Sequence, residues 1–138
     1  MTVIIQRGAV GAGFWSVIGP HACGMVDNGT ADQIRVTATD RWFFAHDDFA
    51  DEHHVVGFGC LRTDANGSGR LCHNWVSIDF RGRGIARALT QARIACAISE
   101  RLPFLTTVAA PMLVPMFTNL GFLAIGQRGK YTRMRRDL

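Results

Sequence analysis

Apolar positions in this chain follow two spacings, which separate the expected strands from the expected helices. After residue 41, short apolar runs follow one another, bounded by residues such as Gly, Asn and Asp. Within residues 83–101, by contrast, apolar residues from Ile85 to Cys96 recur at spacings of four, three and four. A period near 3.6 is typical of an amphipathic helix, and Pro103 would end it. The pattern therefore predicts one long helix, over residues 83–101.

The short apolar runs predict the strands of a sheet. A second, imperfect helix is expected over residues 111–119, where Pro115 interrupts the pattern and Gly121 supplies a C-terminal cap. Asn66-Gly67 marks a hairpin turn. From residue 41 the predicted order is β-β-β-α-β-α-β-β. The predicted strands cover residues 42–46, 54–61, 70–78, 104–109, 122–127 and 131–136.

The first forty residues carry weaker signals. Residues 2–6 predict a strand, and the apolar stretch 14–24 predicts a short helix punctuated by Gly19-Pro20. Asp27-Asn28-Gly29 is a turn signal. Because no repeat, linker or low-complexity segment divides the 138 residues, a single domain over residues 1–138 is expected, with residues 1–40 as its atypical part.

Composition narrows the class of protein. Apolar residues make up 48% and charged residues 19% of the chain, and no window of eighteen apolar residues occurs. A membrane span is therefore not expected, and the N-terminus lacks the pattern of a signal peptide. The four cysteines, Cys23, Cys60, Cys72 and Cys96, are widely spaced. They predict reduced packing residues in a cytoplasmic protein and no zinc site.

The formal net charge of +4 is unevenly distributed. Residues 128–138 hold five basic residues and one acid, whereas residues 46–54 hold four acids and three histidines. A basic tail can bind nucleic acid or an anionic cofactor, but the solvated face of a terminal strand is favoured. The acidic segment could hold a metal or attract a cationic amine. A polar connection between strands is favoured, and no metal is expected, because no further ligand spacing completes a site.

The most informative local pattern lies where the third strand meets the long helix. There the sequence Arg81-Gly82-Arg83-Gly84-Ile85-Ala86 leads directly into the helix. A strand, turn and helix in this order direct free backbone N–H groups and the positive end of the helix dipole at one point. Such a point binds anions, most often a phosphate or pyrophosphate. Glycines at positions 82 and 84 would let a ligand oxygen approach the backbone.

This string fits the pattern Arg/Gln-x-x-Gly-x-Gly/Ala and resembles the acyl-CoA pyrophosphate loop of the GNAT acetyltransferases. A dinucleotide fingerprint fits less well, because its third glycine is missing and the loop lies past the middle of the chain. The likeness extends to Leu120-Gly121-Phe122 and to the final hairpin at residues 128–134, and it covers roughly residues 41–138. It implies an α/β (α+β) fold, with one GNAT-like domain, a mixed central sheet with a splayed strand pair, and helices on both faces. The family normally places two helices in the N-terminal part, which is short here.

The resemblance also implies a co-substrate and its contacts. Acetyl-CoA or another acyl-CoA would lie beside the third strand, with backbone groups of Val76 and Ile78 bonding the pantetheine amides. A backbone N–H near Val76 would polarise the thioester carbonyl. The acyl group would pass to an amine of a small molecule or a protein, by direct attack in a ternary complex. The residues of the implied pyrophosphate loop are Arg81, Gly82, Arg83, Gly84, Ile85 and Ala86.

Candidates for acid–base chemistry are less clear. The family commonly has a tyrosine acid in its late helix, where this chain has Phe117, and an asparagine where it has Ala110. Tyr131, the only tyrosine, could replace that acid, although a packing role is favoured, and loss of the thiolate to water needs no side chain. His73 is the candidate base at neutral pH, against a structural role for a lone strand histidine.

Strand alternation makes a further prediction about the strand that carries this histidine. It places Cys72 and Asn74 on one face of the sheet, and His73 and Trp75 on the other. Which of these faces would meet the acceptor is left open by the sequence.

Two alternatives from other classes stay open. One is a degenerate GNAT-fold module with a structural or regulatory role and no turnover, which Phe117 and Ala110 favour. The other is a nucleic-acid-directed modification protein that uses the basic tail and the Arg81, Arg83 and Arg87 cluster. Acetyl-CoA affinity would separate the first from an enzyme, and salt-sensitive nucleic-acid binding would separate the second. The acceptor, the acyl chain and the oligomeric state are not specified, so a homodimer also stays open.

Overall fold

The computed structural model describes residues 3–8, 12–22, 34–47 and 54–138. The strands are β1 Val3–Gly8, β2 Arg41–Asp47, β3 Val55–Thr63, β4 Gly69–Val76, β5 Phe104–Ala109, β6 Leu123–Arg128 and β7 Tyr131–Asp137. The helices are α1 Ala12–Ala22, α2 Ile85–Ser99 and α3 Val114–Asn119, with short 3-10 turns at Ile78–Phe80 and Pro111–Leu113. All eight elements predicted after residue 41 are present, and so are the strand and the short helix before it. The predicted turn at residues 27–29 lies outside the described residues.

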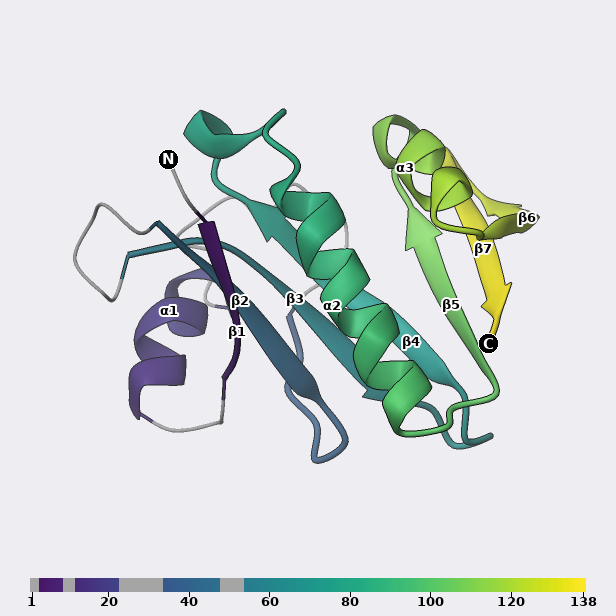
Figure 1. The fold of residues 1–138 in the computed structure, drawn as a ribbon, viewed down its shortest axis with the longest axis horizontal. Helices are drawn as coiled ribbons and strands as arrows, with labels where there is room; N and C mark the ends of the chain where they lie inside the picture. The colour runs from purple at the N-terminus through teal and green to yellow at the C-terminus, as the bar shows by residue number, and fades with distance from the viewer. Residues whose placement is uncertain (1–2, 9–11, 23–33, 48–53) are drawn as a thin grey trace.

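The strands form one seven-stranded mixed sheet in the order β1-β2-β3-β4-β5-β7-β6 (Figure 1). Every neighbouring pair is antiparallel except β4 and β5, which run parallel. A parallel pair needs a crossover connection, and α2 supplies it. The predicted α+β class with a mixed sheet is confirmed.

Helices cover both faces of the sheet, as alternation along β2 shows. Trp42 and Phe44 join the apolar cluster of α1, whereas Phe43 and Ala45 join the cluster of α2. A third cluster packs α2 and α3 together against β5 and β7. The side facing α1 is called the α1 face below, and the other the α2 face. None of the described helices is both long and apolar enough to cross a bilayer.

The parallel strands β4 and β5 stay together for only three residue pairs. Gly69, Arg70 and Leu71 pair with residues 105–107, and no pairing follows. The hydroxyl of Thr107 donates to the carbonyl oxygen of Leu71 at 3.1 Å, which ties the strands at the point of separation. Beyond this tie they diverge toward their carboxyl ends (Figure 1). The expected splayed strand pair is therefore confirmed.

A bulge in β4 changes which side chains face which helix. Phe58 pairs with Trp75 and Cys60 with Cys72, so that two residues of β4 lie opposite Gly59 alone. His73, one of the two, has a φ of 57°, which is unusual for a residue with a side chain. The predicted simple alternation is consequently wrong. Cys72 and Trp75 both pack in the α1-face cluster, and Asn74 contacts α2 instead.

Candidate active site

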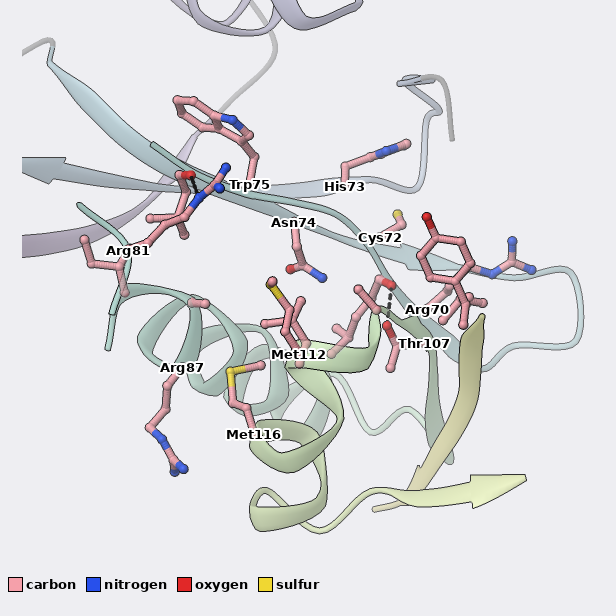
Figure 2. A pocket seen from close by; sticks show the side chains of 18 of the residues that line it. Arg70, Cys72, His73, Asn74, Trp75, Arg81, Arg87, Thr107, Met112 and Met116 are labelled. Atoms are coloured by element: carbon pink, nitrogen blue, oxygen red, sulfur yellow. Dashed lines mark hydrogen bonds between the residues drawn. The ribbon is translucent and has the colours of Figure 1, made fainter. Parts of the chain in front are cut away.

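A cavity of ≈ 940 Å³ occupies the opening between β4 and β5. Its walls come from β4, the loop that begins α2, the end of β5, the residues around α3, and the start of β7. Figure 2 shows Arg81 and Arg87 at one end and Arg70 at the other, with Asn74, Met112 and Met116 between them. A volume of this size suits a small-molecule or cofactor site. The end at Arg81 and Arg87, beside the loop that begins α2, is called the loop end, and the end at Arg70 is called the arginine end.

The loop end is built from backbone groups. Gly82 and Gly84 have φ values of 74° and 80°, and a Cβ at either position would meet no other atom within 4 Å. Gly84 is also the N-cap of α2, and no side chain caps the helix. The first-turn N–H groups thus lack helical acceptors, and the loop before them lines the cavity, which is the arrangement of an anion site. This geometry agrees with the predicted pyrophosphate loop.

Six of the eight predicted co-substrate residues line the cavity, and two do not. Ile78 begins the 3-10 turn after β4, and its side chain is 74% exposed. Arg83 lies over the ring of Phe80 at 5.3 Å from the ring centroid. Contacts from these two residues would have to come from their backbone. The lining residues are Val76, Arg81, Gly82, Gly84, Ile85 and Ala86.

The middle of the cavity has two strand edges without a neighbouring strand. Residues 72–76 of β4 and 108–109 of β5 have no partner across the gap. Their facing N–H and C=O groups are available to an extended ligand that carries amides, since such a ligand can bond like an added strand. The carbonyl of Val76 is the exception, because Arg81 Nε donates to it at 3.0 Å (Figure 2).

Asn74 points into this gap and is held by a buried arginine. Arg93 is fully buried in α2, and its guanidinium donates to the carbonyls of Leu89 and Cys60 and to the Asn74 side-chain oxygen. Because arginine can only donate, the amide oxygen of Asn74 must face Arg93, which leaves the NH₂ group as a donor toward the cavity. Burial lowers the pKa of Arg93 to about 10. Because this value is still well above 7, the guanidinium is cationic at neutral pH.

This pair was not predicted from the sequence. A local signal existed, because Arg93 stands four residues after Leu89 and four before Ala97, on the apolar stripe of the helix. Room for the guanidinium comes from Gly59, where a Cβ would lie 2.8 Å from Arg93 Cζ. Because Gly59 lies on a strand that is distant in the sequence, the apolar pattern of the helix alone does not reveal this requirement.

The arginine end contains both acid–base candidates. The His73 ring stacks on Trp42 at 5.7 Å, and its Nε2 accepts a long bond of 3.4 Å from the Arg35 backbone N–H. Tyr131 is half-buried and lines the same cavity. The structure thus brings the two candidates into one site, and their roles stay predictions.

The late helix does not present Phe117 to the cavity. Phe117 is fully buried and meets the Phe122 ring edge-on at 5.2 Å. Met116 lines the cavity in its place, and Ala110 lines it from the preceding turn. Neither of these side chains can donate a proton, so α3 supplies no general acid.

Two cysteines lie side by side across β3 and β4. The hydrogen bond between the two thiols raises the pKa of buried Cys60, and burial raises it further. The same bond lowers the pKa of Cys72, with Arg62 and Arg93 adding to the effect against burial. Cys72 lines the cavity. Among the described residues the free thiols are Cys60, Cys72 and Cys96, and no group of three residues could hold a metal. Cys23 lies outside the described residues.

The basic tail (residues 128–138) and the acidic segment (residues 46–54) lie in different parts of the fold. In the basic tail, Arg135 pairs with Asp137 at 2.8 Å and lies over the Phe104 ring at 3.7 Å, so it is held on a strand surface. In the acidic segment only His46, Asp47 and His54 are described. The His54 ring lies 6.2 Å from that of Phe80, near the loop end.

Comparison with known proteins identifies the family. A family model described as an acetyltransferase (GNAT) domain matches residues 33–135, which is more than half of the chain. The chain belongs to the GNAT acetyltransferase family. No curated protein sequence matches it significantly.

Solved structures share the GNAT fold at low sequence identity. An acyl-CoA N-acyltransferase from Pseudomonas aeruginosa superposes with a TM-score of 0.78 at 15% identity, with 98% of this chain and 99% of that chain covered. Escherichia coli ElaA gives 0.77 at 14% identity, with 99% and 100% covered. Rv2747 from Mycobacterium tuberculosis, in complex with CoA, gives 0.63 at 16% identity, with 70% and 75% covered.

Family membership settles the general activity. The protein is a GNAT acyl-CoA-dependent N-acyltransferase, and its fold class is that of the family. The acyl donor binds as a co-substrate. The acceptor and the roles of individual residues are matters for proposal.

Proposed function

We propose that this GNAT protein transfers an acetyl group from acetyl-CoA to an amine within one ternary complex. The observation that carries the proposal is the continuity of the loop end with the splayed strand edges. A pyrophosphate at the start of α2 would place the pantetheine arm along the unpaired edge of β4. The amides of the arm could then bond to the backbone of residues 74–76.

The reaction needs no covalent enzyme intermediate. The lone pair of the neutral amine attacks the thioester carbonyl carbon, a C–N bond forms, and the C–S bond breaks to release the CoA thiolate. Negative charge develops on the carbonyl oxygen, where backbone N–H groups of the β4 bulge and the Asn74 NH₂ group can donate. The amine nitrogen loses one proton, and the thiolate gains one.

Two side chains are proposed for the proton transfers. His73 would take the amine proton at Nε2, once the amine displaces the 3.4 Å bond from the Arg35 backbone. Tyr131 would protonate the thiolate from the opposite wall, since the α3 residues that line the cavity, Met116 and Asn119, have no ionisable group. Both residues line the cavity, away from the loop that would hold the pyrophosphate.

The test of the proposal is acetyl-CoA binding followed by thiol release. Calorimetry should show binding by the parent protein and none by Gly84→Val, because a branched side chain is strained at φ 80° and stands where the phosphates approach. Gly67→Val is the matched control. Gly67 has φ 85° and open space in the β3–β4 hairpin turn, so the variant carries the same strain away from the cavity.

Arg83→Ala should weaken binding only modestly, because backbone groups hold the anion. Unchanged affinity in Gly84→Val would refute the assignment of the loop. Binding without thiol release from any amine would favour the degenerate module over an enzyme.

A further inference from the structure

The arginine end of the cavity has a charge pattern that bears on the acceptor. Three arginines, Arg35, Arg62 and Arg70, line this end beside His73 and Tyr131. They are contiguous: Arg62 and Arg70 are direct partners across β3 and β4, and Arg62 Nη2 donates to the carbonyl of Arg35 at 2.8 Å. Like charges placed directly opposite each other are unfavourable in a sheet, so this arrangement needs compensation.

Carboxylates provide that compensation from outside the cavity. Arg62 binds both oxygens of Asp40, at 2.7 and 3.1 Å, and Arg70 Nη2 binds Asp64 at 3.1 Å. The side chain of Asp40 is fully buried behind Arg62, and neither aspartate lines the cavity. Within the described chain, Arg35 makes no ion pair. Counted over the described residues, one positive charge is therefore left over at this end.

The part of the lining that the structure describes contains no carboxylate to receive a cationic acceptor. Among the described residues that border the cavity there are five arginines and no Asp, Glu or Lys. A polyamine or another multiply charged cation would meet only like charge here. A carboxylate, by contrast, would meet guanidinium groups whose planar fork matches its two oxygens.

We infer that the acceptor is a small amino compound that carries its own carboxylate, of the α-amino acid class. The inference rests on the proposed function, because it assigns the loop end to acetyl-CoA and the arginine end to the acceptor. The carboxylate binds to Arg35 and to Nη1 of Arg70, whose Nε and Nη2 hold Asp64, and the amine lies toward His73. Arg62 is a positioning residue, because its side chain is only 16% exposed, against 53% for Arg70, and its donors hold Asp40 and the backbone of Arg35.

Size and neighbouring surface favour a small molecule over a polymer. The arginines lie at one end of a cavity of ≈ 940 Å³, a volume in the range of small-molecule sites. On the adjacent strands, Arg135 is already engaged by Asp137 and by the Phe104 ring. A nucleic acid would need a continuous track of available cations, and Arg135 is not available to it.

The experiment compares matched amines by thiol release at saturating acetyl-CoA. Each α-amino acid is paired with its decarboxylated amine, such as phenylalanine with phenethylamine and lysine with cadaverine. The amino acid of each active pair should have the higher kcat/KM, by about 10-fold or more, as expected for a charge-assisted contact. Arg35→Gln and Arg70→Gln should raise KM for the amino acid about 10-fold while kcat and acetyl-CoA affinity are retained.

Arg128→Gln serves as the control, because Arg128 is exposed on β6 and does not line the cavity. It should leave the KM for the amino acid unchanged. If decarboxylated amines react as well as amino acids, the inference is wrong and the proposed function survives. Failure to bind acetyl-CoA, or no thiol release with any amine, would overturn both. Oligonucleotide binding that is lost in Arg35→Gln and Arg70→Gln would replace the amino acid with a nucleic acid.

Discussion

The two ends of the cavity are built in different ways. At the loop end the ligand-facing groups belong to the backbone, and the side chains of Gly82 and Gly84 are absent so that those groups are reachable. At the arginine end the ligand-facing groups are side chains from the segment before β2 and from β3, β4 and β7. A backbone-built end can serve one anionic co-substrate in many relatives, whereas a side-chain-built end can change its acceptor by a few substitutions.

The sharpest way to test this division is to remove a proton donor from the arginine end. Tyr131→Phe should lower kcat by about 10²–10⁴-fold, the usual range for one general acid or base, while acetyl-CoA affinity stays the same. His73→Ala should reduce kcat less and also raise the acceptor KM, because His73 contacts the Arg35 segment. Steady-state kinetics and calorimetry give both readouts. Full activity in both variants would leave positioning and backbone polarisation as the whole mechanism.

A second prediction concerns Arg93, which holds Asn74 between the two ends. Arg93→Lys keeps the charge but cannot reach the carbonyls of α2 and β3 and the Asn74 amide together. We expect the free energy of unfolding to fall by about 2–4 kcal/mol, since buried acceptors lose their donors. Urea denaturation measures the change. Arg87→Lys, on the exposed face of the same helix, should cost less than about 0.5 kcal/mol.

Some of these features could be predicted from the sequence, and others could not. The elements after residue 41 and the loop could be predicted, because apolar period and glycine position are local signals. The burial of Phe117 could not be predicted, because it depends on how α3 packs. The side of the sheet on which Asn74 lies could not be predicted either, because it depends on an extra residue in β4. The N-terminal part was partly predictable: its strand and helix were expected, but Arg35 reaches the site only through contacts with β3 and β4.

A pH dependence should distinguish the ends further. Burial raises the pKa of the Asp40 carboxyl, but bonds from Arg62 and Thr37 outweigh it, and the net pKa lies below the usual 3.8. A lowered pKa in the folded state adds stability that is present above the unfolded pKa and lost as pH falls through the folded value. Asp40→Asn should therefore cost about 1–3 kcal/mol at pH 7 and progressively less below about pH 4. Urea denaturation at the two pH values measures it, and an equal cost at both would contradict the pairing.

The smallest expected effect is chemical and concerns the cysteines beside the arginine end. Cys72 is half-buried in the cavity wall with a lowered pKa, whereas Cys60 is fully buried with a raised one. Iodoacetamide should therefore modify Cys72 before Cys60, and bound CoA should slow the reaction several-fold. Peptide mass spectrometry follows the site and the rate. Cys96, whose thiol donates to Glu100 outside the cavity, is the internal control and should be insensitive to CoA.

The fit of Arg93 against Gly59 has a consequence for how this sequence can diverge. A methyl group at position 59 would lie 2.8 Å from Arg93 Cζ, and loss of the guanidinium would leave an empty, polar-walled space beside the strand. Neither position can change first without a penalty, so substitutions at the two sites should arrive together along an evolutionary lineage. Relatives with a side chain at position 59 should thus carry a shorter residue at position 93. In those relatives no arginine would fix the orientation of the residue equivalent to Asn74.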